Sequence, residues 1–119
     1  MRYFWPYYKK EVRETLISGS DFRNSYLSHA NLRGVQLNTA NLSNADLTGA
    51  DLTGTNLTGA NLVKTNLTGA TLVKANLTNV DLTKANLTKA DLTGANLTGA
   101  NLYWVILIGA TMPDGTIHD

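Results

Sequence analysis

Residues 45–54 read Ala45-Asp46-Leu47-Thr48-Gly49-Ala50-Asp51-Leu52-Thr53-Gly54, which is one five-residue pattern written twice. The period continues in both directions: from Phe22 to Leu107, every residue whose number ends in 2 or 7 is apolar, and 17 of these 18 residues are Leu. We number the repeat so that this residue is position 3. Position 1 is always small, and position 2 is Asn or Asp in 14 of the 18 repeats. Such a repeat dominates any interpretation of the fold.

A five-residue period fits neither an α-helix nor a flat strand. On a helix, successive position-3 residues would lie about 140° apart and surround the whole cylinder. On a strand, an odd period would send them alternately to opposite faces. A short extended segment followed by a corner does fit, because positions 1 and 3 then point inward and position 2 outward. Four such sides would close a coil of about 20 residues, as in solenoids of stacked repeats.

Position 5 has the composition of a corner. It is Gly in eight of the 18 repeats, and Asn24, Asn44 and Asn79 also tolerate a positive φ. Lysine occupies four other corners, at Lys64, Lys74, Lys84 and Lys89. Because a positive φ is uncommon for such residues, we expect some of the turns to keep φ negative.

These repeats resemble the pentapeptide-repeat family over about residues 20–112, and Ala95-Asn96-Leu97-Thr98-Gly99 repeats the pattern. The resemblance implies an all-β fold, a right-handed quadrilateral β-helix, here with about 4.5 coils. We therefore expect an N-terminal cap at 1–19, with an aromatic leader and a possible short helix, then the β-helix at 20–112 and a C-terminal tail at 113–119. The closing residues 109–115 are similar to the ends of many cyanobacterial members.

Stacking the coils predicts an inner ladder of apolar side chains. Two of its columns are Phe22, Leu42, Leu62, Leu82, Leu102 and Leu27, Leu47, Leu67, Leu87, Leu107. Each buried side chain in such a column contributes roughly 1.5–3 kcal/mol. The small residues at position 1 leave room for them.

The last coil breaks the pattern on its outer side. Tyr103, Trp104, Ile106 and Ile108 occupy outward positions that elsewhere hold Thr, Asn or Lys. An exposed apolar patch of this kind indicates an interaction site. Either the tail or a second copy of the chain could cover it. We favour a two-fold homodimer, because the tail is short and mostly polar.

No constellation of residues predicts catalysis. The chain has no cysteine and only two histidines, His29 and His118, and neither stands in a spacing typical of a nucleophile–base pair or a zinc site. Asp114, His118 and Asp119 lie together only in the terminal tail. We expect no enzymatic activity, no cofactor and no metal.

Charge and hydropathy limit the partners. The net charge of +1 does not indicate the basic surface that nucleic-acid binding requires. No run approaches the roughly 18 apolar residues of a membrane span, and the first ten residues lack the apolar core of a signal peptide. We expect a cytoplasmic protein that binds neither nucleic acid nor membrane and whose partner is a protein.

The favoured function is a non-catalytic structural or protein-interaction solenoid that self-associates through its last coil. The family resemblance implies an alternative, a mimic of duplex DNA that binds a type II topoisomerase such as gyrase. Residues 20–112 carry five Asp against six Lys and Arg, so the acidic surface that such a mimic requires is missing. A lesser alternative is ice binding by stacked threonines such as Thr48, Thr68 and Thr88, although the neighbouring Asn and Asp would keep that face hydrated.

Overall fold

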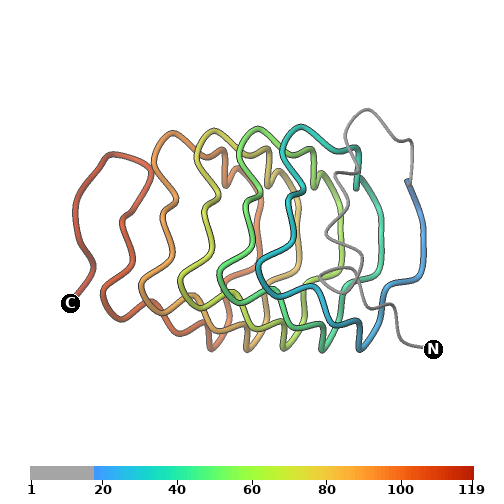
Figure 1. Ribbon diagram of the computed structural model, residues 1–119. Coiled ribbons are helices and arrows are strands. Elements are labelled where there is room, and N and C mark those ends of the chain that lie inside the picture. Colours follow the sequence, from blue (N-terminus) through green and yellow to red (C-terminus); the bar gives the residue numbers. More distant parts are fainter. Residues whose placement is uncertain (1–17) are drawn as a thin grey trace.

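The computed structural model describes residues 18–119, which form a column of stacked coils (Figure 1). Within these residues, fifteen parallel β-bridges join partners twenty positions apart, from Asp21 with Asn41 to Asp91 with Thr111. Each bridge is a single residue pair, so residues 18–119 contain no helix and no continuous strand. The predicted stacking of residues twenty apart is confirmed.

The bridges define four faces, named A to D after the order in which the chain visits them. Their position-2 residues are Asp21, Asn41, Asn61, Asp81 and Asn101 on face A; Tyr26, Asp46, Asn66, Asn86 and Ile106 on face B; Asn31, Asp51, Thr71, Asp91 and Thr111 on face C; and Gln36, Asn56, Asn76 and Asn96 on face D. Coils 1 to 4 are residues 20–39, 40–59, 60–79 and 80–99, and coil 5 begins at residue 100. Faces B and D lie on opposite sides of the column.

Positions 1 and 3 form the core, as predicted. All fourteen leucines at position 3 from Leu27 to Leu92 are at most 2% exposed. Where position 1 is polar, its hydroxyl donates to a backbone carbonyl: Thr55 to that of Leu32 at 2.6 Å, for example. Toward the end of the column the predicted ladder differs, because Leu102 is 38% exposed and Leu107 is only partly buried. No further coil lies over these two side chains.

Backbone hydrogen bonds hold each coil to the next at two points on every side. On face A, the Leu62 N–H donates to the Asp81 carbonyl at 2.8 Å, and the Asp81 N–H donates to the Ala60 carbonyl at 3.1 Å. Each corner adds a third bond, as when the Lys64 N–H donates to the Thr83 carbonyl at 2.9 Å. Adjacent coils must therefore keep the same backbone shape.

The expectation that lysine corners keep φ negative is wrong. All eighteen position-5 residues from Asn24 to Gly109 have φ between 57° and 72°, and the four lysines lie at 57° to 60°. The reason is the bond from the corner N–H to the next coil, which all fifteen corners from Asn24 to Gly94 make and which requires the same backbone conformation at each of them. A left-handed conformation costs a non-glycine residue roughly 1–2 kcal/mol, and the stacking outweighs this cost.

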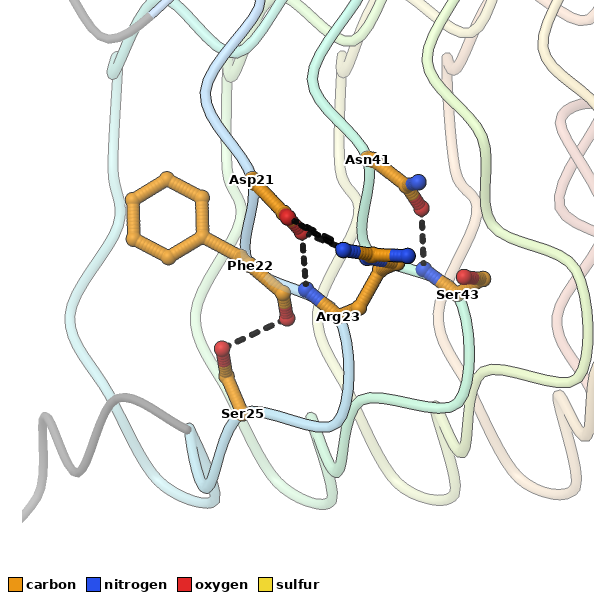
Figure 2. A network of polar contacts seen from close by, with 6 residues as sticks. All are labelled: Asp21, Phe22, Arg23, Ser25, Asn41 and Ser43. Carbon is orange, nitrogen blue, oxygen red and sulfur yellow. Dashed lines mark hydrogen bonds and ion pairs between the residues drawn. The ribbon is translucent and has the colours of Figure 1, made fainter. Parts of the chain in front are cut away.

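The preference for Asn or Asp at position 2 has a local cause. The side-chain oxygen at position 2 accepts a hydrogen bond from the backbone N–H at position 4, which starts the turn. Figure 2 shows this contact in coils 1 and 2, where Asp21 accepts from Arg23 and Asn41 accepts from Ser43, each at 3.1 Å. Where position 4 is Thr, the hydroxyl also donates to the same oxygen, as from Thr48 to Asp46 at 2.6 Å.

The structure describes the C-terminal end of the chain but not its first 17 residues. The N-terminal cap predicted at 1–19 lies outside the described residues, apart from Ser18 and Gly19. The C-terminal tail turns back on face C as a hairpin, in which Thr111 and Ile117 form an antiparallel bridge. The His118 N–H donates to the Ala110 carbonyl at 2.8 Å, and the Gly109 N–H donates to the His118 carbonyl at 2.8 Å.

Candidate functional site

The four residues predicted as an interface are all exposed. Tyr103 is 63% exposed, Trp104 68%, Ile106 42% and Ile108 63%. They surround one corner of coil 5: Tyr103 precedes the corner on face A, Trp104 forms it, and Ile106 and Ile108 follow on face B. The rings of Tyr103 and Trp104 meet edge to face, with centroids 5.6 Å apart. We call these four residues the coil-5 patch.

The coil that precedes the coil-5 patch is polar in the same columns. The residues one coil earlier in the same columns are polar: Thr83, Lys84, Asn86 and Thr88. The tail, one of the two expected covers, pairs with Gly109, Ala110 and Thr111 on face C and leaves the coil-5 patch exposed.

The same end of the column is an open backbone edge. Among residues 18–119, the N–H groups of Leu97, Leu102 and Leu107 donate to no carbonyl. One coil earlier, the corresponding N–H groups each donate to the coil above, as from Leu82 to Asn101 at 2.8 Å. Free donors beside exposed apolar side chains form a template for another strand.

Reasoning from the sequence identified the outward patch and predicts that the ends of such a column are open to strand addition. Leu102 and Leu107 were predicted as ordinary members of the inner ladder. The patch and the edge together make one surface that is apolar and rich in unpaired donors.

The tail also carries Asp114, His118 and Asp119, the titratable residues that lie close together in the sequence. Asp114 accepts hydrogen bonds from the hydroxyl and the backbone N–H of Thr116, at 2.6 and 3.0 Å, and these bonds lower the pKa of Asp114. Nowhere in residues 18–119 do three His, Cys, Asp or Glu side chains gather as ligands for a metal ion. That part of the chain also has no helix long and apolar enough to span a membrane.

Comparison with known proteins supplies the family. A family model described as pentapeptide repeats matches the chain in 8 copies, over residues 13–44, 38–72 and 75–112. No curated protein sequence matches.

Three solved structures of pentapeptide repeat proteins are similar to the chain. HetL, involved in heterocyst differentiation regulation in the cyanobacterium Nostoc sp. strain PCC 7120, is 36% identical with a TM-score of 0.87, over 92% of this chain and 52% of HetL. A protein from the thylakoid lumen of Arabidopsis thaliana is 35% identical with a TM-score of 0.73, over 87% of this chain and 69% of that one. Rfr23 from the cyanobacterium Cyanothece 51142 is 34% identical with a TM-score of 0.55, over 92% and 64%. The chain thus spans about half the length of HetL.

Proposed function

This chain belongs to the pentapeptide-repeat family, and on that premise we propose that it is a non-catalytic protein-interaction solenoid that self-associates through coil 5. In this proposal the scaffold is the right-handed, four-sided coil that the family resemblance implies, with about 4.5 turns. The observation that carries the proposal is the coil-5 patch beside an open backbone edge.

A second copy fits this surface better than a polar partner would. The patch is apolar, so two copies meeting through it would each remove apolar area from water. A specific dimer buries about 800 Å² on each partner, so the interface would have to include both the column end and the coil-5 patch.

The symmetric arrangement is favoured over head-to-tail stacking. In a two-fold dimer the coil-5 patch of one copy meets the same patch of the other, so apolar residues face each other. Head-to-tail stacking would instead bring Trp104 toward coil 1, whose outer side carries the exposed Asp21–Arg23 ion pair at 2.8 Å. Such an arrangement would also propagate into filaments, whereas a two-fold dimer is closed.

The test is the solution mass of a variant. We expect the wild type to scatter light as a particle of twice 12.9 kDa. Trp104→Asp with Ile106→Asp should be monomeric, because two carboxylates would lose their hydration at the interface. Lys74→Asp with Asn76→Asp places the same residue types at the same repeat positions on coil 3 and should leave the dimer intact. A monomeric wild type, or a dimeric Trp104→Asp, Ile106→Asp variant, would contradict the proposal.

The two alternatives receive less support. Two of the carboxylates available to a DNA mimic, Asp21 and Asp51, are paired with arginines at 2.8 and 3.1 Å. In the threonine columns considered for ice binding, the hydroxyls donate inward to position 2, as from Thr68 to Asn66 at 2.7 Å.

A further inference from the structure

Positive charge within residues 18–119 is unevenly distributed along the column. All the lysines of this region are exposed corner residues of coils 3 and 4: Lys64, Lys74, Lys84 and Lys89. None of them forms an ion pair within the described residues, whereas both arginines do, Arg23 with Asp21 and Arg33 with Asp51. The unpaired cations are therefore concentrated in the two coils below the coil-5 patch.

Three of these lysines border one face. Lys64 and Lys84 stack at the corner between faces A and B, and Lys89 lies at the corner between faces B and C. Face B itself carries no carboxylate in coils 3 and 4, because its position-2 residues there are Asn66 and Asn86. The nearest aspartates are Asp46, which is bridged to Asn66 from coil 2 on face B, and Asp81 and Asp91 on faces A and C.

The two asparagines present hydrogen-bond donors to solvent. The Asn66 Oδ1 accepts from the Thr68 N–H at 3.0 Å and from the Thr68 hydroxyl at 2.7 Å. The Asn86 Oδ1 accepts from Thr88 in the same way, at 3.0 and 2.6 Å. Because these bonds fix the amide oxygen toward the turn, the amide NH₂ group is left on the other side, where no hydrogen bond occupies it within the described residues. Face B of coils 3 and 4 thus combines amide donors with ammonium groups.

We propose that face B of coils 3 and 4 binds the carboxylates of an acidic segment of a partner protein. The ammonium groups of Lys64, Lys84 and Lys89 supply the charge, and the Asn66 and Asn86 amides donate to carboxylate oxygens, which are charge-assisted hydrogen bonds. The proposal does not depend on self-association, since none of these residues lies in coil 5.

Two further features agree with this assignment. The three lysines adopt φ of 58° to 60°, a conformation in which glycine would be less strained, so folding alone does not explain their presence. A nucleic acid fits the face less well, because strong binders neutralise about six to ten phosphates and only three lysines border this face.

The decisive variant is Asn66→Asp with Asn86→Asp. Aspartate can still accept both hydrogen bonds from the threonine, as Asp46 does from Thr48 at 3.0 and 2.6 Å on the same face. Its second carboxylate oxygen, however, replaces the outward amide NH₂ donor with an acceptor. We expect its affinity for a short fluorescein-labelled poly-L-glutamate, measured by anisotropy at about 0.15 M salt, where charges are screened over about 8 Å, to fall at least about tenfold. Asn76→Asp with Asn96→Asp adds the same two charges on the opposite face D and should change the affinity by less than about twofold, because screening limits the reach of the added charges.

A second set of variants tests the charge. Lys64→Gln with Lys84→Gln and Lys89→Gln should lose binding, whereas Lys74→Gln, at the corner between faces C and D, should retain it. Three outcomes would overturn the proposal: no binding of poly-L-glutamate by the wild type, equal losses in the face-B and face-D variants, or tighter face-B-dependent binding of an oligothymidylate of matched length. The last result would assign the face to single-stranded nucleic acid instead.

Discussion

At position 5 the backbone conformation is uniform although the side chains are not. Glycine, asparagine, lysine, histidine, threonine and tryptophan all occupy corners with φ between 57° and 72°. Each of these residues must present its N–H to the coil above or leave that bond unmade. The conformational cost therefore varies from corner to corner, and it is highest where the side chain is β-branched.

Thr39 is the corner where this cost should be easiest to measure. It is β-branched and has φ of 59°. Thr39→Gly should stabilise the protein by about 1 kcal/mol in urea unfolding, after allowing for the greater freedom of glycine in the unfolded chain. Gly59→Thr, at the same corner one coil later, should destabilise by a similar amount. If the two substitutions changed stability in the same direction, backbone strain would not be the cause.

The position-2 carboxylates predict a dependence of stability on pH. The hydroxyl and N–H of Thr93 donate to Asp91 at 2.6 and 3.0 Å, and they hold the pKa of this carboxyl below its ordinary value. Because the folded pKa is lower than the unfolded one, the ionised group stabilises the fold above the unfolded pKa of about 3.9. That contribution is lost as the pH falls through the folded pKa.

Asp91→Asn should remove this dependence. Asparagine can accept both bonds, as Asn76 does from Thr78, and it does not titrate. Urea midpoints measured from neutral pH downward should therefore fall more steeply for the wild type than for the variant below about pH 4. Parallel curves for the two proteins would show that Asp91 does not contribute.

At the scale of the coil, several corner side chains extend along the column axis and lie beside the corner of the next coil. The His29 ring occupies the space beside Gly49, where a Cβ would lie 2.5 Å from Nδ1. Lys74 and Lys89 lie similarly over Gly94 and Gly109, with Cγ 3.3 Å from the position of a Cβ. At these three corners a large residue is followed by a glycine twenty residues later, which leaves room for its side chain.

A double-mutant cycle tests this pairing. Gly49→Ala and Gly69→Ala share the same positive φ and the same corner column, but a Cβ at Gly69 would meet nothing within 4 Å. We expect Gly49→Ala to cost about 1 kcal/mol more than Gly69→Ala in unfolding free energy, because the His29 ring must move. His29→Ala should abolish the excess cost, and an unchanged difference would contradict the pairing.

Across the whole molecule, the burial of the apolar ladder falls off at the coil-5 end of the column. Leu62 in coil 3 is fully buried, whereas Leu102 in the same column is 38% exposed in coil 5. The end of the column is therefore the place where apolar surface is available for association, and the middle is where it contributes most to the fold.

The leucine column should show this gradient in stability. In dilute solution, Leu62→Ala should cost about 3–4 kcal/mol and Leu102→Ala only about 1–2 kcal/mol. Leu42→Ala, fully buried in coil 2, serves as the control and should match Leu62→Ala. If coil 5 is the dimer interface, the cost of Leu102→Ala should rise with protein concentration, because association stabilises the wild type more. Equal costs at both sites in dilute protein would contradict the gradient.

The sequence by itself determined the coil and its contents. The five-residue period, with a small residue, an Asn or Asp and a Leu in order, specifies which side chains point inward, because that choice depends only on neighbours within one repeat. The coil-5 patch could also be predicted from the sequence, because its residues depart from the five-residue repeat.

The tertiary structure alone decided what depends on residues twenty positions away. It set the positive φ of the lysine corners, since each corner N–H bonds to the coil above. It placed the tail hairpin on face C, and so left the coil-5 patch and Leu102 exposed. Local pattern cannot supply these results, because they follow from the contacts that stacking creates.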